Sequence, residues 1–286
     1  MKHLLFTTAI LLHISLAANS QSSVWKVEGN NTEFYIGGSF HILRNQDYPL
    51  PNEFYEAYDK SEILTTEMDM NEMNNPANAL KVQQKLMFQD ENTLRGVLSE
   101  EVYSKLDSVS KGLGMNIKAM DKFRPSMVVI ALTFQSLQKL GVTTQGVDVH
   151  FTDKANRDAK SLLFLETFDE QLSFIESMGA GNENEFVLYS LEDIETNEKE
   201  FIDLIEDWKI GRQDLIEKQM QDFKLNYPDI YETLVVKRNN NWMSHLENYL
   251  KTPEVEFVIV GAAHLSGTDG VLNKLKQKGY NVSQLQ

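Results

Sequence analysis

Two segments far apart in the chain share one pattern, a hydrophobic run that ends in Gly-x-x-His. The first runs from Glu33 to His41 and the second from Glu256 to His264, with Glu, Phe, Ile, Gly and His at equivalent places. A glycine allows a sharp turn where a strand ends. In open α/β sheets, ligands bind beyond the carboxyl ends of the strands. The pattern therefore predicts that His41 and His264 share a site at that edge.

Two imidazoles in one site suggest a metal ion or a general acid–base pair, and either kind of site needs a third group. Glu67 ends a short run of β-branched and apolar residues that starts at Glu62, so its carboxylate can reach the same edge. The alternative for Glu67 is an acid on the surface or at a helix start. Because the chain has no cysteine, any metal ligands must be His, Asp or Glu.

Arg238 is a candidate for binding a carboxylate or a developing oxyanion. It is followed by Asn239 and precedes a helix that is expected to begin near Trp242. A surface ion pair is the alternative interpretation of Arg238.

Asp148 and His150 form the remaining candidate pair. Both follow Gly146 at an expected helix start. An N-capping aspartate and a solvent-facing histidine are the simpler interpretation of this pattern, and a place in the shared site is the alternative.

Strands and helices that could position these residues alternate at both ends of the chain. Gly29-Asn30-Asn31 separates two alternating runs and predicts a hairpin. Apolar runs at strand or helix spacing predict the other elements. Strands are expected at 24–27, 33–37, 62–67, 161–166, 255–260 and 280–282, and helices at 54–61, after 145, over most of 170–250 and at 267–278.

Residues 71–145 carry apolar residues at helical spacing and predict a mostly helical insertion. The expected fold class is therefore α/β, as one domain over residues 21–286. We expect a central mixed sheet with the Gly-x-x-His motifs at its carboxyl edge.

The composition is that of a globular protein, with 42% hydrophobic and 24% charged residues among 286. It excludes disordered, collagen-like and coiled-coil chains. Lys and Arg number 27 against 42 Asp and Glu, a formal net charge of −15, which argues against nucleic-acid binding. We expect a peptide or a small molecule as the partner, and the oligomeric state stays open.

The first 20 residues are expected to be an export signal. Lys2 precedes a mostly apolar stretch, Leu4 to Leu16, that is too short for a stable membrane anchor. Small residues at Ala18-Asn19-Ser20 predict cleavage after Ser20, and an uncleaved anchor is the alternative. No lipobox cysteine follows, and no later run is long and apolar enough to span a membrane. An exported chain without disulfides indicates a periplasmic or secreted protein of bacterial origin.

Through a series of blocks the chain resembles the TraB/GumN family, which includes the Tiki metalloproteases. The paired Gly-x-x-His motifs with Glu67 between them are the most specific part of the resemblance. The blocks lie at 24–27, 38–43, 62–69, 145–148, 165–167 with Gln171, 238–242, 260–267 and 279–280, and extend over nearly the whole chain after residue 20.

The resemblance implies an α/β fold shared with erythromycin-esterase-like and haem-uptake-associated proteins. From the Tiki branch it implies metal-dependent cleavage of peptide bonds, with manganese or cobalt favoured, and this carries over onto His41, Glu67 and His264. We expect no carboxyl-terminal membrane anchor of the Tiki kind. Further family positions are matched by Asp148, His150, Arg238 and Asn239.

The leading hypothesis is an exported, metal-dependent hydrolase, in the first place a peptidase. His41, Glu67 and His264 would hold manganese, cobalt or zinc with its activated water, and Glu67 would act as ligand or base. Arg238 or His150 would stabilise the oxyanion.

One alternative is a non-catalytic protein of the bacterial envelope that sequesters a peptide or small ligand in the same cleft. Another is a metal-free, esterase-like hydrolase with His41 or His264 as the base.

Overall fold

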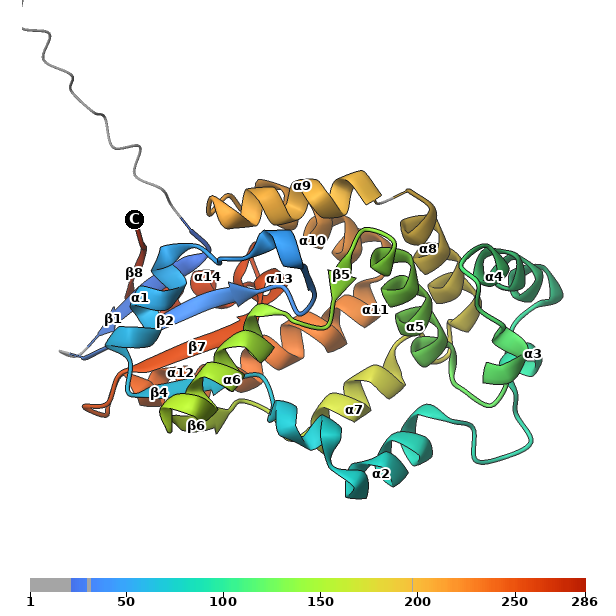
Figure 1. The fold of residues 1–286 in the computed structure, drawn as a ribbon, viewed down its shortest axis with the longest axis horizontal. Helices are drawn as coiled ribbons and strands as arrows, with labels where there is room; N and C mark the ends of the chain where they lie inside the picture. Colours follow the sequence, from blue (N-terminus) through green and yellow to red (C-terminus); the bar gives the residue numbers. More distant parts are fainter. Residues whose placement is uncertain (1–21, 30–31, 197) are drawn as a thin grey trace, which may run out of the picture.

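The computed structural model describes residues 22–29, 32–196 and 198–286 (Figure 1). The export signal expected at residues 1–20 lies outside the described residues. No helix in the described ranges is both long enough and apolar enough to cross a membrane.

A six-stranded mixed sheet forms one end of the molecule and confirms the expected α/β class (Figure 1). Strands β6, β4, β7 and β2 are parallel neighbours, and β1 runs antiparallel to both β2 and β8. The carboxyl ends of the four parallel strands therefore meet at one edge. In spatial order the strands are β6 (Ser161–Phe164), β4 (Ile63–Thr66), β7 (Glu256–Gly261), β2 (Thr32–Ser39), β1 (Val24–Gly29) and β8 (Asn281–Gln284).

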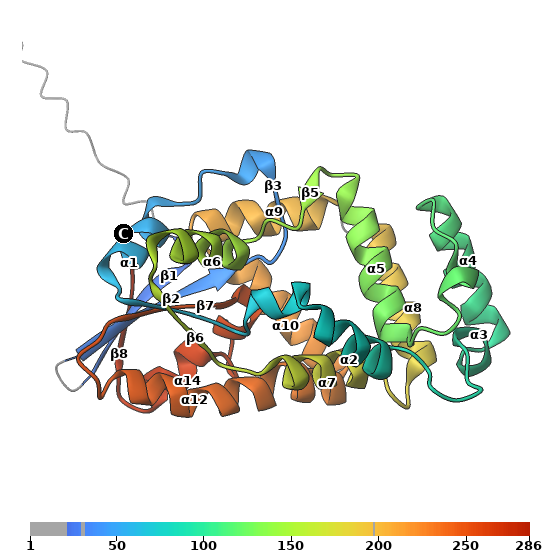
Figure 2. The same ribbon diagram turned by 60° about the horizontal axis from the view of Figure 1, so that its bottom comes forward.

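Helices cover both faces of the sheet, as Figure 2 shows for α1 and α6 on one side and α12 and α14 on the other. Strand β7 is buried along its whole length because alternate residues enter the two cores. Phe257 packs in the core with Phe54 and Trp208, whereas Val258 packs in the core with Trp242. The covering helices are α1 (Asn52–Lys60), α6 (Val147–Asp158), α9 (Glu198–Lys209) and α10 (Asp214–Asn226) on the first core, and α12 (Arg238–Tyr249) and α14 (Val271–Gln277) on the second.

The helical part of the chain lies beyond the carboxyl edge of the sheet and has its own core. Val128 and Leu132 of α5 share this core with Leu106 of α4 and with Phe186 and Leu191 of α8. The expected insertion at 71–145 thus packs on a helix that follows β6. Its helices are α2 (Pro76–Leu86), α3 (Leu94–Val97), α4 (Glu100–Gly112) and α5 (Pro125–Gln138), and they pack with α7 (Phe168–Ser177) and α8 (Glu183–Thr196).

Short elements complete the chain. A two-stranded ladder of β3 (Leu43–Arg44) and β5 (Val142–Thr143) joins the end of the insertion to the loop after β2. The remaining elements are η1 (Asn45–Asp47), η2 (Met70–Asn74), η3 (Ile117–Met120), α11 (Pro228–Tyr231), the π-helical η4 (Glu232–Lys237) and α13 (Ala262–Leu265).

Candidate functional site

Each of the four parallel strands delivers one polar side chain to the carboxyl edge of the sheet. His41 follows the end of β2, and Glu67 directly follows β4. Glu166 follows β6, and His264 lies on α13, which begins where β7 ends. The structure therefore brings together the three residues that the sequence assigned to one site, and adds Glu166 to them.

Gly261, the last residue of β7, marks the point around which the three side chains meet. A Cβ atom on Gly261 would lie 3.3 Å from Glu67 Oε1, 3.3 Å from His41 Nε2 and 3.4 Å from His264 Cδ2. The backbone N–H of Gly261 also donates a hydrogen bond of 2.7 Å to Glu67 Oε1. Glycine thus provides the space for the cluster and fixes one oxygen of its carboxylate.

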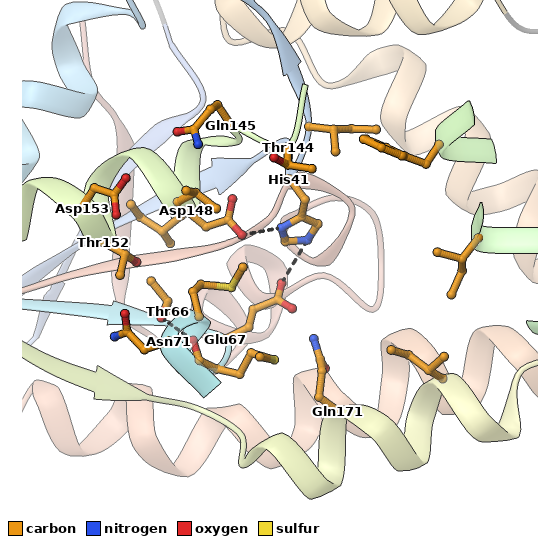
Figure 3. Close-up of a pocket in the computed structure, with 18 residues that line it drawn as sticks. His41, Thr66, Glu67, Asn71, Thr144, Gln145, Asp148, Thr152, Asp153 and Gln171 are labelled. Carbon is orange, nitrogen blue, oxygen red and sulfur yellow. Dashed lines mark hydrogen bonds and ion pairs between the residues drawn. The ribbon is translucent and has the colours of Figure 1, made fainter. Parts of the chain in front are cut away.

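His41 is held by Asp148 and faces Glu67 (Figure 3). Its Nδ1 lies 2.9 Å from Asp148 Oδ2, and its Nε2 lies 3.9 Å from Glu67 Oε1. An ionised carboxylate only accepts hydrogen bonds, so we assign a proton to Nδ1. Gly146 permits this contact, because a Cβ there would lie only 2.3 Å from the carbonyl carbon of His41. The side chain of His41 is 54% exposed.

The two carboxylates set the charge state of His41. Desolvation disfavours the imidazolium, but the charge and hydrogen bond of Asp148, and then the charge of Glu67, outweigh it and raise the pKa of His41 to about 9. The ring is therefore a strong base whose two nearest charges stabilise its protonated form.

His264 is buried and is held as a neutral ring by Asn239. The amide nitrogen of Asn239 donates to the backbone carbonyls of His264 (3.2 Å) and Asp269 (2.9 Å), so Asn239 Oδ1 faces His264 Nδ1 at 2.7 Å and accepts its proton. The unprotonated Nε2 then accepts from Arg238 Nη1 at 3.1 Å. Burial, and then the positive charge of Arg238, lower the pKa of His264 to about 3.

Arg238 is the buried cation that joins the parts of the site. Its Nε and Nη2 donate to both oxygens of Glu166 at 2.7 and 2.9 Å, and Nη2 also donates to Glu67 Oε2 at 2.6 Å. A further bond of 3.2 Å reaches Gln171 Oε1. Although burial favours a neutral carboxyl, the charge of Arg238 and then that of His41 hold the pKa of Glu67 well below its usual range. Arg238 thus keeps Glu67 ionised and fixed.

A cavity of about 740 Å³ opens in front of His41 and Glu67. Asp148 and Gln171 also line it, and Ile130 of α5 contributes to an apolar part of its wall. The helical insertion therefore forms part of the cavity. Among the described residues that line the cavity, none is Lys or Arg, and Arg238 itself lies behind Glu67.

The three expected metal ligands are close together, but their arrangement does not fit a three-ligand metal site. His264 Nε2 already accepts a hydrogen bond from Arg238, and both oxygens of Glu67 accept bonds from Gly261 and Arg238. Within the described ranges, no group of three or more His, Asp or Glu side chains is placed to hold a metal ion. Of the three side chains, as the structure describes them, only His41 has a nitrogen, Nε2, that faces the cluster and makes no hydrogen bond.

His150, expected as a catalytic candidate, is not brought to this cluster. Its ring lies 5.3 Å from the ring of Tyr48, 5.8 Å from that of Tyr55 and 5.1 Å from that of Phe151. Its buried Nε2 has no hydrogen-bond partner among the described residues. Its placement indicates packing among aromatic rings.

Glu166 and Gln171 were not assigned a role from the sequence. Glu166 ends its expected strand as Glu67 ends another, and this parallel is the signal that could have identified it. Gln171 lies four positions after Thr167, which caps the start of α7. Nothing in this spacing indicates that the Gln171 side chain faces a cavity.

Most of the chain is similar in sequence to known proteins of one family. A sequence profile described as the TraB/PrgY/gumN family matches residues 23–284. One relative, "Uncharacterized protein YbaP" of Escherichia coli (strain K12), is 23% identical over 261 residues, which cover 86% of this chain and 89% of the relative.

Proposed function

The chain belongs to the TraB/PrgY/gumN family, and from this premise we propose that it is a hydrolase that cleaves a peptide or a small molecule with water activated at His41. One observation carries the proposal. Asp148 holds Nδ1 of His41, so that Nε2 is directed towards Glu67 and the cavity. A histidine oriented by a carboxylate behind it is the arrangement of a general base.

In this reaction, neutral His41 accepts a proton from a water molecule at Nε2 as the water attacks the carbonyl carbon of the substrate. Asp148 and Glu67 stabilise the imidazolium that forms. Glu67 stays ionised because Gly261 and Arg238 donate to its oxygens. The proton on His41 then passes to the leaving group, and the ring returns to its neutral form.

The second candidate is the metal-dependent peptidase that the sequence favours. His41, Glu67 and His264 would bind manganese, cobalt or zinc only if Arg238 released His264 Nε2 and Glu67 Oε2. The charge of the cluster supports it. The carboxylates of Glu67, Glu166 and Asp148 outnumber the two cations of the cluster, the guanidinium of Arg238 and the imidazolium of His41. Such an excess of buried negative charge favours a cation. A bound ion would supply a Lewis acid and a more acidic water.

The experiment measures hydrolysis of internally quenched peptides and of p-nitrophenyl butyrate by protein purified without chelator. Wild type is compared with His41→Ala, and with His245→Ala as the matched control, because His245 is an exposed histidine away from the cluster. Each protein is assayed before and after exhaustive chelation, and its metal content is measured.

Turnover that is lost in His41→Ala, kept in His245→Ala and unchanged by chelation supports the general-base hydrolase. Turnover that chelation removes and manganese, cobalt or zinc restores supports the second candidate, and Glu67→Gln should then lose the metal. Stoichiometric binding of a peptide with no turnover under any condition contradicts both and supports a sequestering protein.

We also propose that the chain is exported and that residues 1–20 are removed. The family match begins at residue 23, shortly after the expected cleavage at Ser20, and the chain before it carries Lys2 and the apolar stretch Leu4 to Leu16 that are typical of an export signal. Intact-mass measurement of the protein from periplasmic and secreted fractions tests this proposal. Full-length protein found only in the cytoplasmic fraction contradicts it.

A further inference from the structure

We propose that the side-chain amide of Gln171 is a catalytic donor, whose Nε2–H binds the substrate carbonyl oxygen as that oxygen gains negative charge. The inference rests on the proposed hydrolase function and assigns the group that complements the base. Hydrolysis of a carbonyl compound places negative charge on this oxygen, and a donor aimed at it lowers the barrier.

The orientation of the Gln171 amide is fixed by Arg238. Arg238 Nη2 lies 3.2 Å from Gln171 Oε1, and a guanidinium can only donate hydrogen bonds. The oxygen of the amide must therefore face Arg238, which places Nε2 and its two hydrogens on the other side. Figure 3 shows this nitrogen at the tip of the Gln171 side chain, directed into the cavity.

The Gln171 amide lies across Glu67 from His41. One nitrogen, Arg238 Nη2, donates to both Gln171 Oε1 and Glu67 Oε2, the latter at 2.6 Å, so the two acceptors are neighbours. On its other side, Glu67 Oε1 lies 3.9 Å from His41 Nε2. In Figure 3, Glu67 lies between the His41 ring and Gln171. A carbonyl group in this part of the cavity has the base on one side and the amide donor on the other.

The backbone under Gln171 is firmly held. Gln171 lies in the first turns of α7, and its N–H donates to Thr167 O at 3.1 Å. Thr167 and Glu170 form a reciprocal capping box at the start of the helix. A donor on a capped helix keeps its position when the substrate binds.

Arg238, the donor that the sequence suggested for this role, is committed elsewhere. It is 8% exposed and donates to Glu166, Glu67, Gln171 and His264. Nε, both hydrogens of Nη2 and one of Nη1 are directed at these partners, and Arg238 does not line the cavity. Arg238 therefore acts as a positioning residue that orients Gln171 and Glu67.

The test uses the full-length protein and whichever of the two probes the wild type hydrolyses. Gln171→Glu keeps an acceptor for Arg238 but removes the donor, and Gln171→Met removes both. Gln84→Met is the matched control, because Gln84 is an exposed glutamine on α2 that does not line the cavity, whereas Figure 3 shows Gln171 at it. For each variant we would measure kcat, KM, the pH profile and the thermal unfolding midpoint.

We expect kcat to fall about 10²–10³-fold in both Gln171 variants, which is the usual effect of removing one oxyanion donor. In Gln171→Met, KM and the midpoint of the pH profile should stay near those of the wild type, because His41 is intact. In Gln171→Glu the added carboxylate should shift that midpoint upward, as the charge of Glu67 does. A merely structural role would lower the unfolding midpoint instead. A folded Gln171→Glu variant with wild-type kcat overturns the inference, as does an equal loss of kcat in Gln84→Met.

The failure of this inference differs from the failure of the proposed function. If the wild type hydrolyses a probe, and His41→Ala does not while both Gln171 variants do, only the role of Gln171 is wrong. If the wild type hydrolyses neither probe, the proposed function and the inference both fail.

Discussion

Nδ1 of His41 lies 2.9 Å from Oδ2 of Asp148, although 107 positions separate the two residues. The contact joins the end of β2 to the first turn of α6. It exists because Gly146, which precedes α6, lets that helix start against the backbone of His41. The charge state and the direction of the His41 ring therefore depend on a carboxylate from another element.

Asp148→Asn should lower the pKa of His41 from about 9 towards the ordinary histidine value of about 6.5. It should also lower kcat, by about 10²–10⁴-fold, because the amide no longer fixes the tautomer or stabilises the imidazolium. NMR titration of the His41 ring and steady-state kinetics measure the two effects. Asp153→Asn is the control, since Asp153 lines the same cavity from the same helix. An unchanged His41 titration in Asp148→Asn would contradict the role of the contact.

The rate of the metal-free reaction should rise with pH. The pKa of His41 is about 9, so the neutral, basic ring becomes about tenfold more abundant per pH unit below that value and then levels off. The measurement is kcat/KM between pH 6 and pH 10 after chelation. The same raised pKa contributes folding stability that is fully present below about pH 6.5 and is lost as pH rises through about 9. A value of kcat/KM that stays constant between pH 7 and pH 10 would disprove the role of His41 as the base.

Glu256→Gln should make the fold more stable at alkaline pH. Glu256 is 2% exposed, its Oε2 has no partner among the described residues, and burial raises its pKa to about 7. The stability of the protonated form is fully present below about pH 4.5 and is lost as pH rises through about 7. Urea unfolding at pH 8 should show a gain on the order of 1–3 kcal/mol, with little change at pH 5.

The exposed Glu91→Gln substitution is the control for Glu256→Gln, and it should leave the pH dependence of stability unchanged. Equal free energies of unfolding for wild type and Glu256→Gln at pH 8 would contradict the prediction, because ionisation of Glu256 would then cost the fold no stability.

Gly261→Ala should reduce activity far more than stability. The added methyl group would lie 3.3 Å from both Glu67 Oε1 and His41 Nε2, so those side chains must shift by a few tenths of an ångström in a cluster whose function depends on their spacing. The backbone of Gly261 is in a conformation that alanine adopts readily, with φ −50° and ψ 134°. Kinetics and thermal unfolding measure the two effects. Gly112→Ala, whose methyl group meets nothing within 4 Å, should keep full activity and gain up to about 1 kcal/mol. Full activity of Gly261→Ala would show that the cluster needs no such space.

Arg238→Met should destabilise the fold by about 3–5 kcal/mol, because it leaves two buried carboxylates without their cation. Those carboxylates belong to Glu67 and Glu166, which are 6% and 7% exposed. Arg95→Met removes an exposed ion pair and should change the free energy of unfolding by less than about 1 kcal/mol. Urea unfolding of both variants gives the comparison, and similar values for the two would contradict the buried-clamp role of Arg238.

The strand ends explain why much of the site could be predicted from the sequence. His41, Glu67 and His264 all follow buried parallel strands. The carboxyl ends of parallel strands lie at one edge of the sheet, independently of the length and conformation of the connecting loops. Asp148 and His150 show the limit of such reasoning. They lie two positions apart on α6, and residues with this spacing face different sides of a helix. Only one of them could join the cluster, and packing decided that it was Asp148.

Other features depend on contacts that no local pattern indicates. The insertion was expected from its helical spacing, but its shared core with Phe186 of α8 depends on tertiary packing. The bonds from Arg238 to Glu166 and Gln171 join α12 to residues about 70 positions earlier. Side chains of this kind are placed by the completed fold.

Strand β7 lies between β4 and β2 in the middle of the sheet, although it is the last strand but one along the chain. Until residues 256–261 have been synthesised, β1 with β2 and β4 with β6 can form only two separate strand pairs. His264, Gly261 and the bond from Gly261 to Glu67 are then all missing. An unfinished or carboxyl-terminally clipped chain therefore lacks the cluster of His41, Glu67 and His264, which can assemble only after nearly the whole sequence has been made.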